Sequence, residues 1–100
     1  MKTISADPML DQGWRLSPAV ALRPEPFGAM AYHFGNRKLT FLKKPELVRV
    51  VRSLGDNPTV RGALVQADIP ETQWHAYLAA LGSLAAADMI RASKGQVPND

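Results

Sequence analysis

The chain has 100 residues, of which 46% are hydrophobic and 21% are charged, and its formal net charge at pH 7 is +3. This length supports one compact domain with a modest core, and the composition excludes disorder along the whole chain. Because the chain has no cysteine, it forms no disulfide and offers no thiolate for catalysis or for metal binding.

Both ends have the composition of flexible tails, so we predict a folded domain over residues 14–91 between tails at 1–13 and 92–100. The N-terminal tail lacks an apolar run of signal-peptide length. The longest apolar stretch, residues 78–90, is interrupted by polar residues and is shorter than the roughly 20 residues that span a bilayer. We therefore expect a cytoplasmic protein that does not associate with membranes.

Residues 16–43 carry the signals of β-strands. Val20 and Leu22 alternate with other residues until prolines at 24 and 26 interrupt regular pairing. A second alternating run begins at Gly28, and its apolar face consists of three large side chains: Met30, Tyr32 and Phe34. Ala29, Ala31 and His33 lie on the opposite face.

Gly35-Asn36 then predicts a two-residue hairpin loop, because both residue types tolerate positive φ. Residues 37–43 form the third strand, with Leu39 and Phe41 on one face. Together the three runs predict an antiparallel meander.

The second half of the chain predicts three helices. The first begins at Pro45 and ends at Gly55, a glycine suited to a left-handed stop. The second begins at Pro58, is capped by Asp56 or Asn57, and buries Val60, Ala63 and Leu64. The third and longest has an apolar stripe of six residues: Trp74, Tyr77, Leu78, Leu81, Leu84 and Ala85.

Three strands followed by three helices indicate an α+β domain. The second and third helices are separated by a turn of a few residues, which suits a helix-turn-helix packed on a small sheet. We therefore predict a winged-helix-like domain, with a three-stranded antiparallel meander followed by three helices.

The residues that catalysis needs are not grouped. His33 and His75 are the only histidines, and neither has metal-ligand spacing to a second ligand. The serines do not lie in a strand-turn-helix elbow, and the glycines are too far apart to cradle a phosphate. We expect no catalytic residue, no metal site, no cofactor and no enzymatic activity.

Basic residues gather between the predicted hairpin loop and the second helix: Arg37, Lys38, Lys43, Lys44, Arg49, Arg52 and Arg61. They form either an ordinary solvated surface that protects a sheet edge or a site for an anionic partner. Nucleic acid is one such partner for a winged helix. However, residues 71–88 of the third helix contain no Lys or Arg to neutralise phosphates or read bases.

The third strand offers a different kind of binding site. In a meander its outer edge has unpaired backbone groups, so an extended peptide can add there as a further strand beside an apolar helix. Most of the stripe on the third helix must be core, and only its flanks are left to line a groove.

The stretch from Trp14 through Leu42, with its segments L-R-P-E-P-F-G-A and Y-H-F-G followed by F-L-K, closely resembles the mycofactocin-system peptide-binding proteins. That family belongs to the recognition elements for ribosomally synthesised modified peptides, with the pyrroloquinoline-quinone peptide chaperone. The match is strongest over about the first half of the domain.

This resemblance implies a winged-helix peptide chaperone without catalytic activity. It would bind the leader of a precursor peptide and present it to a radical S-adenosylmethionine maturase in mycofactocin biosynthesis. In the wider group the leader adds beside the third strand and packs against the third helix. Carried over, the peptide-binding residues are Lys38, Leu39, Thr40, Phe41, Leu42, Lys43, Tyr77, Leu78 and Leu81.

Residues 22–28 have two interpretations, either a rigid bend fixed by prolines or a docking surface for the maturase that uses Arg23 and Glu25. For the whole chain, two functions compete with the peptide chaperone. One is a winged-helix DNA-binding protein, and the other is a structural subunit that stabilises an enzyme.

Overall fold

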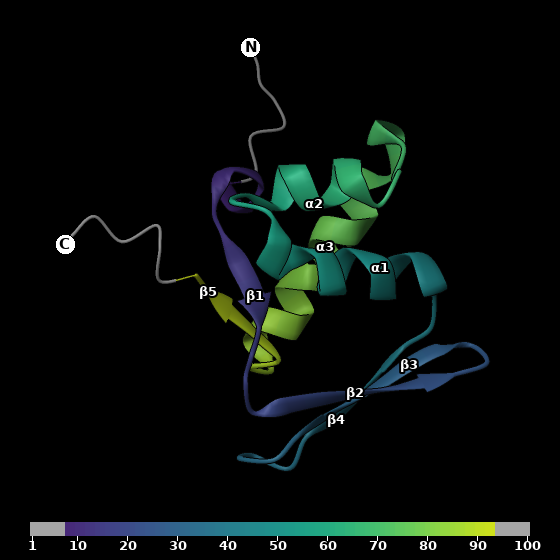
Figure 1. The fold of residues 1–100 in the computed structure, drawn as a ribbon, viewed down its shortest axis with the longest axis vertical. Helices are drawn as coiled ribbons and strands as arrows, with labels where there is room; N and C mark the ends of the chain where they lie inside the picture. The colour runs from purple at the N-terminus through teal and green to yellow at the C-terminus, as the bar shows by residue number, and fades with distance from the viewer. Residues whose placement is uncertain (1–7, 94–100) are drawn as a thin grey trace, which may run out of the picture.

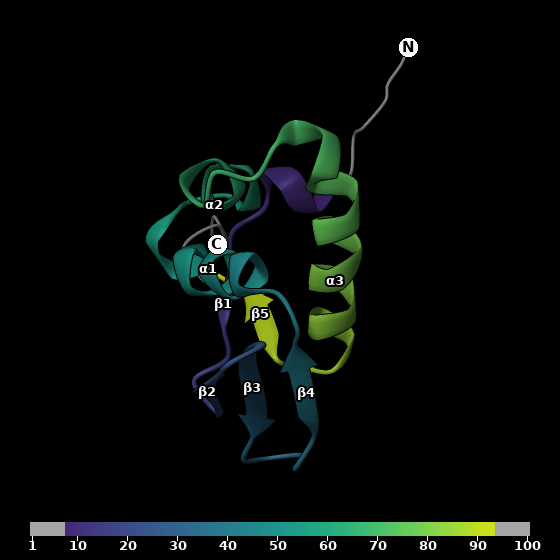
Figure 2. The same cartoon turned by 90° about the vertical axis from the view of Figure 1, so that its right-hand side faces the viewer.

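The structure is a computed structural model that describes residues 8–93. Within this range it contains three α-helices and two antiparallel sheets, so the predicted α+β class and its strand meander are confirmed (Figures 1 and 2). The meander lies to one side of the helices, and the second, smaller sheet lies beside the helices (Figure 1). The comparison with winged helices stays a prediction.

The elements follow one another in the order β1, β2, β3, β4, α1, α2, α3, β5. Their bounds are β1 Trp14–Leu16, β2 Val20–Glu25, β3 Gly28–His33, β4 Leu39–Leu42, α1 Pro45–Ser53, α2 Val60–Gln66, α3 Trp74–Ala86 and β5 Ile90–Ala92. Three short 3-10 turns add to these: Pro8–Asp11, Leu54–Asp56 and Glu71–Gln73.

The larger sheet is the predicted meander, with β3 in the centre and with β2 and β4 at its edges. Strand β2 continues through Pro24, which lies opposite Ala29, although the sequence indicated that this proline would interrupt pairing. An edge strand tolerates proline because only one side of it needs hydrogen bonds.

The loop between β3 and β4 is longer than the predicted Gly35-Asn36 turn. The N–H of Arg37 donates to the carbonyl of His33 at 2.8 Å, and the N–H of His33 donates to the carbonyl of Lys38 at 3.0 Å. The residue with positive φ is Arg37, at 64°. The predicted hairpin is therefore present, but the two-residue loop was wrong.

The orientation of the meander is opposite to what side-chain size suggests. Ala29, Ala31 and His33 are buried, with at most 5% exposure, while Phe34 on the opposite face is 62% exposed. Strand β3 packs against α1, and small side chains permit this close approach. The larger apolar side chains of β3, Met30 and Tyr32, consequently face away from the helices.

The helices match the prediction except at their ends. Gly55 lies in a 3-10 turn after α1 and does not adopt a left-handed conformation. The cap of α2 is Thr59, whose Oγ1 accepts a hydrogen bond from the N–H of Gly62 at 3.1 Å. Asn57, one of the two predicted caps, instead donates to the carbonyl of Ser53 at 2.9 Å.

Helix α3 buries the predicted stripe. The four residues that reach the core are Tyr77, Leu78, Leu81 and Leu84. None of the described helices is both long enough and apolar enough to cross a membrane.

The smaller sheet, β1 with β5, was not predicted. It pairs Trp14 with Ala92 and Leu16 with Ile90, so the ends of the described chain meet beside the helices. Residues 8–13 pack against α2, because Leu10 is only 5% exposed and the carbonyl of Gln12 accepts a hydrogen bond from the N–H of Val60 at 2.9 Å. The remainder of the two predicted tails, residues 1–7 and 94–100, lies outside the described residues.

Candidate functional site

Strand β4 has one side paired with β3 and one side free. The hydrogen bond from His33 to Lys38 sets the alternation of the antiparallel ladder. By that alternation, Thr40 and Leu42 direct their backbone groups to β3, while Leu39 and Phe41 direct theirs away. Along this edge, no described residue bonds the outward N–H and C=O groups.

The free edge of β4 borders a pocket that we call the β4–α3 groove. Its volume is about 280 Å³, and it is lined by Phe41, Lys43, Lys44, Leu47, Ala76, Tyr77 and Ala80. Figure 2 shows β4 as the strand of the meander nearest to α3. The residues come from β4, the connection from β4 to α1, the start of α1 and one side of α3, so the groove exists only in the folded chain.

Two alanines give the groove its room. Ala76 and Ala80 are four residues apart, so they lie one turn above each other on α3. Between them Tyr77 is only 5% exposed, and the ammonium of Lys44 lies 5.6 Å from the centre of its ring. This cation–π contact places the charge of Lys44 beside the ring, in a lining that is apolar except for Lys43 and Lys44.

The groove continues into a more polar hollow that shares Lys44 and Tyr77 with it. The other lining residues are Glu46, Arg49, Asp68, Ile69, Pro70 and Gln73. An extended ligand would therefore meet apolar side chains beside β4 and charged side chains beyond Lys44.

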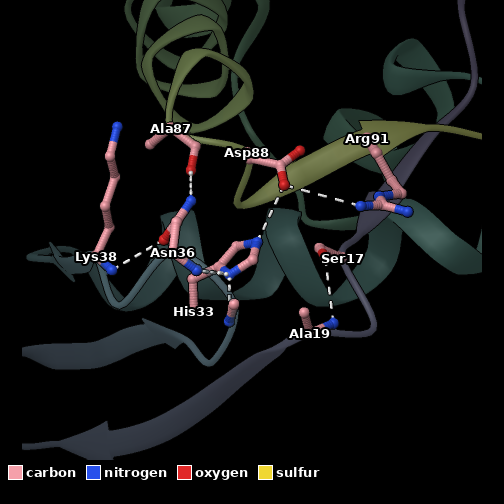
Figure 3. Close-up of polar contacts among 9 residues, drawn as sticks. Ser17, Ala19, His33, Asn36, Lys38, Ala87, Asp88 and Arg91 are labelled. Atoms are coloured by element: carbon pink, nitrogen blue, oxygen red, sulfur yellow. Dashed lines mark hydrogen bonds and ion pairs between the residues drawn. The ribbon is translucent and has the colours of Figure 1, made fainter.

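Outside the groove lining, hydrogen bonds join the segment before β4 to the residue after α3 in a group that we call the His33 cluster: His33, Gly35, Asn36 and Asp88 (Figure 3). His33 Nδ1 accepts from the backbone N–H of Gly35 at 2.9 Å and of Asn36 at 3.1 Å. The ring proton must then be on Nε2, which donates to Asp88 Oδ2 at 3.0 Å.

Asn36 strengthens the same link, because its Nδ2 donates to the carbonyl of Ala87 at 3.3 Å. Ala87 and Asp88 directly follow α3, whereas His33 and Asn36 precede β4. The cluster therefore fastens the strand on one side of the groove to the helix on the other.

The structure divides the nine predicted binding residues into three groups. Phe41, Lys43 and Tyr77 line the groove together. Lys38, Leu39 and Thr40 lie along the same edge but outside the lining. Leu42, Leu78 and Leu81 are core residues with at most 9% exposure.

Sequence reasoning missed four residues of the lining: Lys44, Leu47, Ala76 and Ala80. The spacing of the two alanines was the available signal, because small residues four positions apart lie on one side of a helix and leave a hollow there. Periodicity alone assigns large apolar residues such as Leu78 and Leu81 to a face without separating core from groove.

The basic residues do not form one cluster. Lys43 and Lys44 line the groove, and Arg49 lines the polar hollow. Arg61 instead pairs with Asp11 at 3.0 Å, and Arg52 borders a separate hollow beside Arg15. Within residues 8–93 there is no group of His, Asp and Glu side chains suited to a metal ion.

A free strand edge beside an apolar groove is the geometry of domains that bind extended peptides by strand addition. The chain belongs to the peptide chaperone MftB family, whose model matches residues 13–91.

The similar proteins are all described as "Peptide chaperone MftB". The chain is 52% identical to the one from Mycolicibacterium smegmatis over 87 residues, 87% of this chain and 83% of the relative. It is 52% identical to the one from Mycobacterium ulcerans and 50% identical to the one from Mycobacterium tuberculosis, each over 80% of this chain and 73% of the relative. No solved structure matches the chain.

Proposed function

We propose that this protein is a peptide chaperone of mycofactocin biosynthesis, which binds the leader of a precursor peptide and presents it to a radical S-adenosylmethionine maturase. The observation that carries the proposal is the unpaired edge of β4 beside the β4–α3 groove. The name and the high identity of the relatives support the same role.

The leader would add as a strand along β4. The outward N–H and C=O groups of Leu39 and Phe41 would pair with its backbone, as the geometry of an antiparallel or parallel ladder requires. Because side chains alternate along an added strand, every second leader residue would point toward the helices and the β4–α3 groove.

The groove favours an apolar leader side chain. Phe41, Leu47 and Tyr77 offer apolar contacts, and Ala76 and Ala80 leave the space that such a side chain needs. Lys43 and Lys44 lie at the same place, so acidic leader residues next to the apolar one would be attracted. We therefore propose a leader motif that combines apolar and acidic residues.

The experiment is a fluorescence titration of a labelled precursor peptide, taken from the neighbouring open reading frames, into the protein. It compares wild type with Leu39→Ala and Leu39→Pro. The proline removes one outward N–H that β3 does not use, and an edge strand tolerates it. Alanine is the matched control, because it shortens the side chain and keeps the N–H.

Wild type should bind one peptide with micromolar affinity or better. Loss of one hydrogen bond of about 0.5–1.5 kcal/mol should make Leu39→Pro about two- to twelve-fold weaker than Leu39→Ala. Equal affinities of the two variants would contradict strand addition at β4. No binding to folded wild type would reject the peptide chaperone and favour a structural subunit of an enzyme.

A second titration at higher salt measures how much electrostatic attraction contributes to the affinity for the leader. Exposed pairs are screened as ionic strength rises, so the contribution of Lys43 and Lys44 should fall while the apolar contribution remains. A leader affinity that does not change with salt would remove the electrostatic part of the proposal.

A further inference from the structure

The face of the meander that points away from the helices carries six large apolar side chains, which we call the outer sheet face: Phe27, Met30, Tyr32, Phe34, Leu39 and Phe41. Four of them are strongly exposed, at 40% for Phe27, 49% for Leu39, 50% for Phe41 and 62% for Phe34. Monomeric proteins rarely leave such a group in water unless it binds a partner.

The side chains of this face are arranged as a continuous surface. Met30 lies opposite Phe41, and Tyr32 lies opposite Leu39, on neighbouring strands. Phe27 and Phe41 meet edge to face with ring centres 5.8 Å apart, and Tyr32 and Phe34 do so at 5.3 Å. Such contacts hold the rings in place before any partner arrives.

Basic residues border the outer sheet face. Arg23 lies opposite Met30 on β2, and Lys43 lines a shallow hollow with Phe27 and Phe41. Arg37 and Lys38 are exposed in the loop at the other end. The single carboxylate on this face, Glu25, forms an ion pair with Arg23 at 2.9 Å.

We propose that the outer sheet face is the docking surface for the peptide-modifying enzyme, which meets it with an apolar patch bordered by carboxylates. This inference rests on the proposed function, because it names where the enzyme of that function binds. It also gives residues 22–28 a role, since Arg23 and Phe27 lie on the docking surface.

The position of the face suits that partner. Strand β4 separates the outer sheet face from the interior of the β4–α3 groove, and Phe41 borders both. An enzyme on this face would therefore lie beside a peptide added to β4 without displacing it. The peptide would leave the groove next to the enzyme that modifies it.

The charges disfavour a second copy of this chain as the partner. A two-fold contact would bring the basic border of this face, with Arg23, Lys38 and Lys43, against the same basic border of a second copy, and like charges across an interface are costly. Single-stranded nucleic acid fits poorly as well. Bases stack on flat, open rings, whereas these rings are paired at interplanar angles of 71° and 77°.

The test measures the affinity of the folded, full-length chain for the radical S-adenosylmethionine maturase from the neighbouring open reading frames, by biolayer interferometry without peptide. The variant is Tyr32→Thr combined with Phe34→Ser, which removes two rings of the outer sheet face outside the groove lining. The control is Val65→Ser, because Val65 on α2 is 60% exposed and lies off this face. Should the double variant fail to fold, Phe34→Ser alone replaces it.

We expect the outer-face variant to bind the maturase at least ten-fold more weakly, with unchanged affinity for the precursor peptide, and Val65→Ser to match wild type. Unchanged maturase affinity of the outer-face variant overturns the proposal, as does an equal loss in Val65→Ser. Sedimentation that shows a wild-type dimer broken by the variant assigns the face to a second copy instead. The proposal would likewise be overturned if the wild-type protein binds a single-stranded oligonucleotide and the variant does not. Absence of peptide binding by the wild-type protein would count against the proposed function. The maturase titration, which contains no peptide, would still test the docking surface.

Discussion

Replacement of His33 by leucine tests whether the His33 cluster holds the β4–α3 groove in shape. The side chain is buried, and its two ring nitrogens take part in three hydrogen bonds, to Gly35, Asn36 and Asp88. At about 0.5–1.5 kcal/mol each, the three bonds contribute roughly 1.5–4.5 kcal/mol to the free energy of unfolding. Leucine recovers part of that through apolar burial, so we expect a net loss of about 1.5–3 kcal/mol.

The assay is urea unfolding followed by circular dichroism, with wild type, His33→Leu and Asp88→Asn measured together. The midpoint of His33→Leu should fall by about 1 M, because the denaturant dependence of such domains is about 1–3 kcal/mol per molar urea. Asp88 adopts a positive φ of 62°, which asparagine also tolerates, and its amide oxygen can still accept from Nε2. Asp88→Asn should therefore stay close to wild type.

The same variant should weaken peptide binding. Without the bond from His33 to Asp88, the hydrogen bond from Asn36 to Ala87 still links the loop before β4 to the end of α3. We expect this single bond to hold the two sides of the groove less firmly at one spacing. A His33→Leu protein that unfolds at the wild-type midpoint and binds peptide normally would refute this reasoning.

Three further predictions concern the groove, the sheet and the partner. Ala80→Leu should fill the β4–α3 groove and weaken peptide binding at least ten-fold with little change in stability. Ala79 is exposed on the same helix outside that lining, so Ala79→Leu should bind peptide like wild type. Equal effects of the two substitutions would contradict the position of the groove. Gly28→Ala should lower the free energy of unfolding by about 1–3 kcal/mol, measured by thermal melting. The reason is that Gly28 has φ 150° and that a Cβ there would collide with the carbonyl oxygen of Leu42. An unchanged melting temperature would contradict the close approach of β3 to β4. Finally, a leader added to β4 would extend the outer sheet face with its own alternate side chains, so saturating peptide should tighten maturase binding. Weaker maturase binding in the presence of peptide would mean that peptide and enzyme compete.

The helices could be predicted from the sequence because each has a strong local signal. Pro45 marks the start of α1, and the apolar stripe of α3 repeats at helical spacing. The strands β1 and β5 could not be predicted in this way. Each has three residues, and they pair across most of the chain, Leu16 with Ile90, so nothing near either strand in the sequence identifies its partner.

The meander was predicted, but its orientation was not. The prediction treated Met30, Tyr32 and Phe34 as its apolar face, and that face is the exposed one. On β3, the face that packs on α1 consists of Ala29, Ala31 and His33, and the ring nitrogens of His33 are all bonded. The sequence pattern alone does not show that the larger apolar residues of β3 lie on the surface.

The edge of β4 could be predicted from strand order, but the lining of the groove could not. Whether Leu81 or Ala80 faces a ligand depends on how α3 is rotated against the sheet. That rotation is set by packing of the whole core, in which Leu81 is completely buried.

Hydrogen exchange by NMR, with and without the precursor peptide, tests the central claim most directly. Strand addition at β4 predicts that the outward amides of Leu39 and Phe41 exchange slowly only when peptide is bound, because each then donates to the peptide backbone. The amides of Thr40 and Leu42, which face β3, should change far less. Saturating peptide that leaves Leu39 and Phe41 exchanging at their free rates would contradict binding at this edge.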